Sequence, residues 1–240
     1  MESIQFEIHA QPDDISCGPA CLHAVYRYFG TQSDMQAVLR EVPRLPDGGT
    51  LAVHLANHAL SRGYETRIVT WNLQLFDPTW FAGGPERITE RLLLQAQAKS
   101  DPKIREASRA YVQFLGLGGK LEFRELDAAL LRGPLQRGIP IITGLSATFL
   151  YQAARERSHD QEPDDVLGEP VGHFVVLTGY VPGAKLVHVS DPLYPNPLAP
   201  THEYTVGIGR VLGAVYLGAL THDANLLILE PHGWAEQRKS

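Results

Sequence analysis

The sequence predicts an α+β fold, and two observations support this class. Helical patterns with capping residues dominate the first half of the chain, whereas apolar runs bounded by turn residues gather in the second half. No internal repeat or low-complexity linker divides the 240 residues, so we expect a single domain over 1–240. We expect a helical lobe at about 1–135, with an extra helical block at about 72–131, and a sheet lobe at about 136–232.

The first half contains most of the predicted helices. Residues 3–9 alternate apolar and polar side chains, which predicts a half-buried strand. A capping box, Ser33-Asp34-Met35-Gln36, opens a helix that extends to about residue 41. Asp101 and Pro102 form an N-cap and first-turn pair for a helix that reaches residue 115. The remaining predictions are helices at 20–28, 50–62, 86–98 and 124–131, and strands at 65–71 and 121–123.

The second half is dominated by predicted strands. Two of them, 173–180 and 185–191, are joined by the turn residues 181–184 and therefore predict a hairpin. An acidic, proline-broken stretch at 158–170 predicts a surface loop. We also expect a strand at 138–144, a helix at 147–157, and a strand around Tyr204 that completes the sheet with segments 207–218 and 226–230.

Composition and charge exclude several classes of protein. The net charge is -6 and no cluster of Lys and Arg is present, so we expect no nucleic-acid partner. The first residues lack the basic and apolar regions of a signal peptide, and no window approaches 18 apolar residues, so we expect no membrane span. The two cysteines lie four residues apart on one predicted helix, which makes a disulfide unfavourable. A cytoplasmic protein is the expectation that follows.

A side-chain amide and a thiol lie close together near the N-terminus. Gln11 precedes Cys17 by six residues, and Cys17 lies at the start of the predicted helix 20–28. The unpaired N–H groups and the positive end of a helix dipole favour thiolate over thiol. The Gln11 amide and the Cys17 backbone N–H can together form an oxyanion hole for acyl transfer. A lone cysteine, however, is more often a small buried hydrophobe, so catalysis requires a base elsewhere.

A histidine and an aspartate supply the candidate base and its orienting group. His173 begins one strand of the predicted hairpin and Asp191 ends the other, so the two should meet at one end of the sheet. An imidazole held by a carboxylate through one nitrogen can take a proton from sulfur through the other. The alternatives are a strand-end histidine with a satisfied ring and an Asx turn before Pro192.

These motifs resemble one family of enzymes. Gln11, the run Ser16-Cys17-Gly18-Pro19-Ala20-Cys21-Leu22, the strand that begins Gly172-His173, and Asp191-Pro192 are similar to the papain-like cysteine peptidases, in particular the bacteriocin-processing, double-glycine leader peptidase type (peptidase family C-39 and its stand-alone relatives). The resemblance implies a papain-like α+β fold in which an N-terminal helical lobe carries the nucleophile-bearing helix, packed on a C-terminal antiparallel sheet.

The resemblance also implies a role for each residue of the motif. Cys17 is then the nucleophile, His173 the general base and later acid, Asp191 the orienting residue and Gln11 the oxyanion-hole donor. The expected partner is a peptide or protein substrate. The sequence does not identify a partner enzyme in peptide maturation.

Several alternatives stay open. An acyl-cysteine can pass its acyl group to water, as in a peptidase, or to an amine, as in a transferase or ligase, and a non-catalytic peptide-binding module is a third possibility. His54 and His58 have a metal-ligand spacing on one helix, but no third ligand lies nearby, so we expect a packed or solvated helix face, no metal and no cofactor. Cys21, one turn after Cys17, is expected to be structural.

Overall fold

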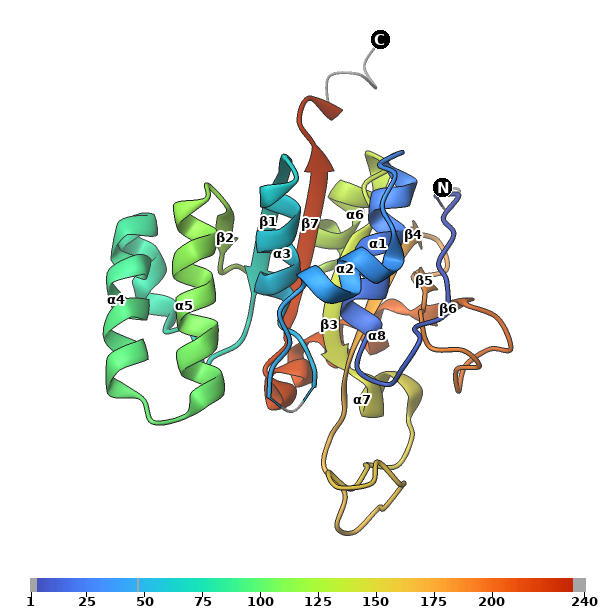
Figure 1. Cartoon of the computed structure of the whole chain (residues 1–240). Helices are drawn as coiled ribbons and strands as arrows, with labels where there is room; N and C mark the ends of the chain where they lie inside the picture. Colours follow the sequence, from blue (N-terminus) through green and yellow to red (C-terminus); the bar gives the residue numbers. More distant parts are fainter. Residues whose placement is uncertain (1–3, 47, 235–240) are drawn as a thin grey trace.

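A seven-stranded sheet forms the centre of the computed structural model, which describes residues 4–46 and 48–234 (Figure 1). The strands are β1 (Tyr64–Thr70), β2 (Lys120–Glu122), β3 (Ile141–Ser146), β4 (Gly172–Val181), β5 (Leu186–Ser190), β6 (Glu203–Gly207) and β7 (Asn225–Pro231). Their order is β2-β1-β7-β3-β4-β5-β6. Every neighbouring pair is antiparallel except β1 and β2, which are parallel.

Helices cover both faces of this sheet. They are α1 (Cys17–Tyr28), α2 (Met35–Glu41), α3 (Ala52–Ser61), α4 (Gly84–Ala98), α5 (Pro102–Gly116), α6 (Ala128–Gln136), α7 (Ala147–Tyr151) and α8 (Ile208–Leu217), with 3-10 helices η1 (Pro78–Gly83) and η2 (Gly218–Thr221). Apolar side chains of α1 to α5 form one core with one face of the sheet, and those of α6 and α8 form a second core with the other face. The predicted α+β class is confirmed.

The sheet differs from the prediction in where its strands originate. β1 and β2 belong to the first half of the chain, so the sheet is not confined to the C-terminal part. β1 pairs over its whole length with β7, from Tyr64 opposite Pro231 to Thr70 opposite Asn225. Non-local pairing of this kind cannot be read from a local pattern. It joins the middle of the chain to its last strand.

The predicted strand at 3–9 is wrong within the described residues. Phe6 and Ile8 are buried between exposed neighbours, so the alternation does mark a half-buried extended segment. Only one backbone hydrogen bond, from Ile4 N to Thr178 O, ties its start to β4. β4 already lies between β3 and β5, so it has no free edge for a further ladder. Residue 3 lies outside the described residues.

Four other predicted elements change at their boundaries or in type. The second helix is capped by the carboxylate of Asp34 rather than by Ser33. The helix predicted at 124–131 begins later, because Asp127 caps it through Leu130 N at 2.8 Å. The helix predicted at 147–157 is only α7, which stops where Gln152 adopts φ 56°. Segment 207–218 is α8, a helix whose apolar side packs on β3, and not part of the sheet.

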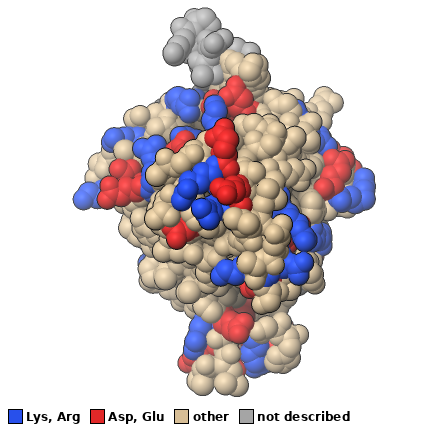
Figure 2. Space-filling model, turned by 90° about the vertical axis from the view of Figure 1, so that its left-hand side faces the viewer, with Lys and Arg blue, Asp and Glu red and all other residues tan. Residues whose placement is uncertain are grey.

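The block at 72–131 extends the molecule beside β2. It contains η1, α4, α5 and β2, and α4 and α5 lie side by side (Figure 1). Asp101 caps α5 through Lys103 N and Ile104 N, as predicted. Figure 2 shows Lys, Arg, Asp and Glu side chains interspersed over this side of the molecule. Among the helices of the described residues, none combines the length and apolar character that a membrane span requires.

The predicted loop at 158–170 projects from one end of the molecule (Figure 1). Part of the negative charge of its carboxylates is neutralised, because Arg157 contacts Asp160 at 2.7 Å and Asp164 at 3.5 Å. Charges of both signs are visible on the projection in Figure 2. The loop leads directly into β4 and therefore into His173.

Candidate active site

Cys17 is the first residue of α1 and is partly exposed, in contrast to the fully buried Cys21. The preceding Ser16 makes no side-chain cap, since its hydroxyl instead accepts a hydrogen bond from Arg44 at 3.1 Å. Pro19 in the first turn has no N–H group to satisfy. The start of α1 therefore presents backbone N–H donors and the positive end of the helix dipole next to the thiol.

The glycine after the thiol is required by close packing. A Cβ at Gly18 would lie 2.7 Å from a methyl carbon of Thr50 and 3.3 Å from the ring of Phe174. Phe174 directly follows His173 on β4, so the absence of a side chain at Gly18 lets the start of α1 approach the histidine strand. The Cys-Gly pair thus has a packing reason as well as the chemical one proposed from the sequence.

His173 and Asp191 meet as the hairpin geometry predicts. Asp191 follows the last residue of β5, and its Oδ1 lies 2.8 Å from His173 Nε2. His173 is 7% exposed and Asp191 is fully buried. A contact this short between a buried imidazole and a buried carboxylate fixes the orientation of the ring.

The second ring nitrogen of His173 is left for Cys17. Because Asp191 holds Nε2, Nδ1 is the nitrogen left for Cys17, whose sulfur lies close enough to act electrostatically on the imidazole. Burial lowers the pKa of His173, but the negative charges of Asp191 and of the Cys17 sulfur outweigh burial and raise that pKa to about 10. The structure thus places Cys17 next to the His173–Asp191 pair.

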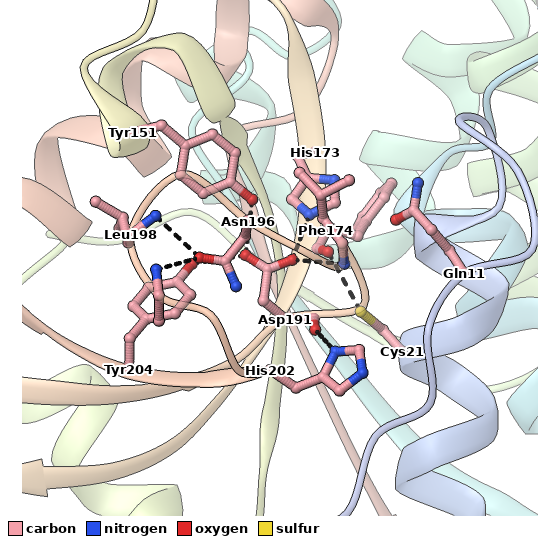
Figure 3. A network of polar contacts seen from close by, with 12 residues as sticks. Gln11, Cys21, Tyr151, His173, Phe174, Asp191, Asn196, Leu198, His202 and Tyr204 are labelled. Atoms are coloured by element: carbon pink, nitrogen blue, oxygen red, sulfur yellow. Dashed lines mark hydrogen bonds and ion pairs between the residues drawn. The ribbon is translucent and has the colours of Figure 1, made fainter.

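Asp191 has two further partners that the sequence analysis missed. The hydroxyl groups of Tyr151 and Tyr204 each donate to its Oδ2 at 2.7 Å (Figure 3), and Leu193 N donates to Oδ1 at 2.9 Å. Burial raises the pKa of Asp191, but the charge of His173 and these hydrogen bonds leave it below its usual range. Tyr151 and Tyr204 come from α7 and the β6 strand, and no local motif links them to Asp191.

Gln11 lies beside the same group of residues. Its backbone N donates to Pro192 O at 2.9 Å, which ties the loop before α1 to the residue after Asp191. Figure 3 shows its side chain pointing from this loop toward His173 and Phe174. One hydrogen of the amide is used, since Nε2 donates to Asp13 O at 2.9 Å. Its Oε1 is buried without a hydrogen-bond partner in the described part of the chain.

Cys21 has the position of a structural residue. Its thiol donates to Phe174 O at 3.3 Å, which links α1 to β4 one turn below Cys17. Burial, followed by the charges of Cys17 and Asp191, raises the pKa of Cys21 well above its usual value. A buried thiol of this kind is unreactive.

The histidines that could hold a metal have other partners. His58 bonds to Tyr26 and Glu41, and His54 lies 3.8 Å from Glu106. No group of three or more His, Cys, Asp or Glu side chains within residues 4–46 and 48–234 is arranged to hold a metal ion. Both histidines pack on the buried side of α3.

One buried carboxyl near the site was not predicted. Asp223 accepts a hydrogen bond from Thr221 at 3.1 Å, and a Cβ at Gly172 would lie 2.5 Å from its Oδ2. The carboxyl thus fills the space that Gly172 leaves next to His173. Burial raises the pKa of Asp223 to about 7, although Thr221, Lys103 and His173 act in the opposite direction.

Comparisons with known proteins agree with this architecture. Residues 101–211 match the model of the Peptidase_C39 like family. A solved structure described as a putative C39-like peptidase from Bacillus anthracis is 15% identical, with a TM-score of 0.50 and coverage of 96% of this chain and 98% of that chain. The chain has the fold of a C39-like peptidase. The fold implied by the resemblance is therefore confirmed, and the family match over residues 101–211 supports a cysteine-peptidase type of function.

Two other solved structures are similar over most of the chain. One is a double glycine motif protease from an AMS/PCAT transporter in complex with a leader peptide, with 13% identity, a TM-score of 0.45 and coverage of 95% of this chain and 94% of that chain. The other is the peptidase domain of Streptococcus ComA, a bi-functional ABC transporter, with 14% identity, a TM-score of 0.44 and coverage of 95% and 100%. No curated protein matches the chain. The C39-like family match contains His173 and Asp191, whereas Cys17 and Gln11 precede it.

Proposed function

We propose that this protein is a cysteine peptidase that hydrolyses a peptide bond through an acyl-enzyme on Cys17. The observation that carries the proposal is that Asp191 holds His173 at 2.8 Å and that Cys17 lies next to this pair, with its sulfur partly exposed at the start of α1. A nucleophile, a base and an orienting carboxylate in this order are the requirements for acyl transfer.

Each residue has a definite part in the proposed reaction. The Cys17 thiolate attacks the carbonyl carbon of the substrate, and the oxygen becomes an oxyanion that accepts hydrogen bonds from the Cys17 N–H and from the remaining N–H of the Gln11 amide. His173, protonated and held by Asp191, gives its proton to the leaving amine as the C–N bond breaks. A water molecule then attacks the thioester while His173 takes its proton, which releases the acid and the Cys17 thiolate.

The proposed substrate is a peptide or protein, and the proposed compartment is the cytoplasm. The substrate class is proposed from the match to the C39-like peptidase family. The site chemistry agrees with it, because an oxyanion hole with a thiol nucleophile suits amide carbonyls. The compartment is proposed because both cysteines are free thiols, and the cytoplasm keeps thiols reduced.

The proposal is tested by incubating the wild type, Cys17→Ala and Cys21→Ala with a mixture of peptides and following cleavage by mass spectrometry. We expect cleavage by the wild type and Cys21→Ala, a loss of about 10⁴-fold or more in Cys17→Ala, and an acylated Cys17 in the intact wild-type protein. An added amine nucleophile separates hydrolysis from acyl transfer, because transfer would place the amine on the product. Cleavage that persists in Cys17→Ala would overturn the proposal.

A further inference from the structure

The carboxylate of Asp191 is saturated by hydrogen-bond donors. Oδ1 receives His173 Nε2 at 2.8 Å and Leu193 N at 2.9 Å, and Oδ2 receives the hydroxyl groups of Tyr151 and Tyr204, both at 2.7 Å. Only an ionised carboxylate offers acceptor sites to four donors at once. The four contacts therefore favour the charged form of a group that is fully buried.

The backbone of Asp191 is held as firmly as its side chain. Its N–H donates to His202 O at 2.8 Å, and its carbonyl oxygen accepts from His202 Nδ1 at 2.7 Å. Tyr151 ends α7 and Tyr204 lies on the β6 strand, so the two phenols reach Oδ2 from independent parts of the fold. A rotation that moved Oδ1 away from His173 would break both of these contacts.

We propose that Tyr151 and Tyr204 are positioning residues that keep Asp191 ionised and directed at His173 Nε2. This inference rests on the proposed function, because Asp191 is useful in this state only if His173 serves Cys17. In this proposal neither tyrosine touches the substrate. Their role is to preserve the negative charge that stabilises the protonated imidazole beside the sulfur.

The groups around Asp191 determine how the effect depends on pH. The titratable groups that face it are His173 on β4, Tyr151 on α7, Tyr204 on β6, His202 just before β6, and Cys21 on α1. Cys17, at the start of α1, acts electrostatically on Tyr151 and His173. Without a phenol, Oδ2 keeps fewer donors and Asp191 takes up a proton more readily. The neutral carboxyl no longer stabilises protonated His173. As the pH is lowered, Cys17 therefore loses its reactivity at a higher pH than in the wild type.

Tyr→Phe substitutions isolate this effect. Phenylalanine keeps the ring, which matters at position 151 because the Tyr151 ring packs against His173 with centroids 6.1 Å apart. Tyr64→Phe is the matched control, since Tyr64, a buried tyrosine, is likewise bonded through its hydroxyl, to Thr31 at 2.6 Å. Tyr64 lies opposite Pro231, at the other end of β1 from the strand ends near the site.

The experiment measures the rate of Cys17 alkylation by iodoacetamide between pH 4 and 9 in Tyr151→Phe, Tyr204→Phe, the double variant and Tyr64→Phe. We expect each single variant to react about 3–10-fold more slowly near pH 5, with the acid limb moved up by about half a pH unit to one unit, and a larger shift in the double variant. Tyr64→Phe should lower the melting temperature without moving the limb.

Folded single variants with the wild-type alkylation profile would overturn the inference, even if the double variant fails to fold. Peptide cleavage by the same proteins is measured in parallel. A shifted alkylation profile in a protein that cleaves no peptide would contradict the proposed function while leaving the effect of the tyrosines on Asp191 established.

Discussion

Helix α1 takes part in two chains of side-chain contacts, and each of them contains a carboxylate and an imidazole. At its start, Asp191 Oδ1 contacts His173 Nε2, and His173 in turn lies next to Cys17. Toward its end, Glu41 Oε2 lies 3.0 Å from His58 Nε2, and His58 Nδ1 lies 2.8 Å from the hydroxyl of Tyr26. Both chains run from a carboxylate through an imidazole to a side chain on α1.

The two carboxylates differ in how their charge is held. The Glu41 side chain is half exposed and shares its Oε2 with Arg62 at 2.8 Å, so a cation already neutralises it. Asp191 is fully buried, and apart from His173 it is surrounded by neutral donors. The imidazoles respond in opposite directions: burial keeps the pKa of His58 below its usual value, whereas Asp191 and Cys17 raise the pKa of His173 to about 10.

The groups at the ends of the two chains differ as well. Tyr26 is 0% exposed, and burial raises its pKa far above the usual value, so its oxygen is neither accessible nor ionised. Cys17 is partly exposed at a helix N-terminus. The comparison teaches that a carboxylate–imidazole chain becomes a candidate catalytic site only where the carboxylate keeps its charge and the terminal atom can be reached.

The largest expected effect separates the two carboxylates. Asp191→Asn should reduce peptide cleavage by about 10²–10⁴-fold, because His173 loses the charge that keeps it protonated and oriented. Glu41→Gln should change cleavage by no more than about twofold, because its chain does not reach the site. Steady-state cleavage rates for both variants test this contrast, and similar losses in the two would remove the distinction drawn here.

A second contrast concerns pH. Asp223 has a pKa of about 7 in the folded protein against about 4 for an unfolded chain, so between these values the folded state holds a proton that the unfolded state releases. Stability therefore falls as pH rises from about 4 to 7, by about 4 kcal/mol at most. In Asp223→Asn this decline should flatten. Urea unfolding across this pH range measures it, and an unchanged slope would contradict the prediction.

The contribution of His58 to stability should depend on pH with the opposite sign to that of Asp223. Because its pKa is lowered in the folded state, the unfolded chain binds a proton first, and stability falls as pH drops below about 6.5. His58→Gln should weaken this acid dependence and cost about 1–3 kcal/mol at pH 7 through the loss of the Tyr26 contact. Unfolding curves at pH 5 and 7 provide the measurement. A marked loss of peptide cleavage in folded His58→Gln would show that the two chains are coupled.

Local sequence was sufficient to predict the main members of the site. His173 and Asp191 lie in one hairpin, so a short-range pattern predicts that they meet, whereas the position of Cys17 beside them depends on the packing of α1 on β4. Tyr151 and Tyr204 lie 40 and 13 residues from Asp191, and their contacts depend on how α7 and β6 pack. That tertiary information is absent from any local window.

The wrong elements have similar physical reasons. The alternation at 3–9 correctly predicts that Phe6 and Ile8 are buried. A strand, however, forms only beside a partner strand that has a free edge, and β4 has none. Segment 207–218 contains several glycines and apolar residues that suit either a strand or a helix, and its packing on β3 decides for α8. The position of Asp223 depends on the space left by Gly172, which no sequence pattern reveals.

The most direct test of the central claim compares the two thiols on α1. Iodoacetamide labelling at pH 7, followed by peptide mapping, gives the alkylation rates of Cys17 and Cys21 in one folded sample. The account predicts that Cys17 reacts at least about tenfold faster than Cys21, and that Asp191→Asn reduces this ratio. Equal rates for the two thiols, or faster reaction of Cys21, would contradict an activated sulfur at position 17.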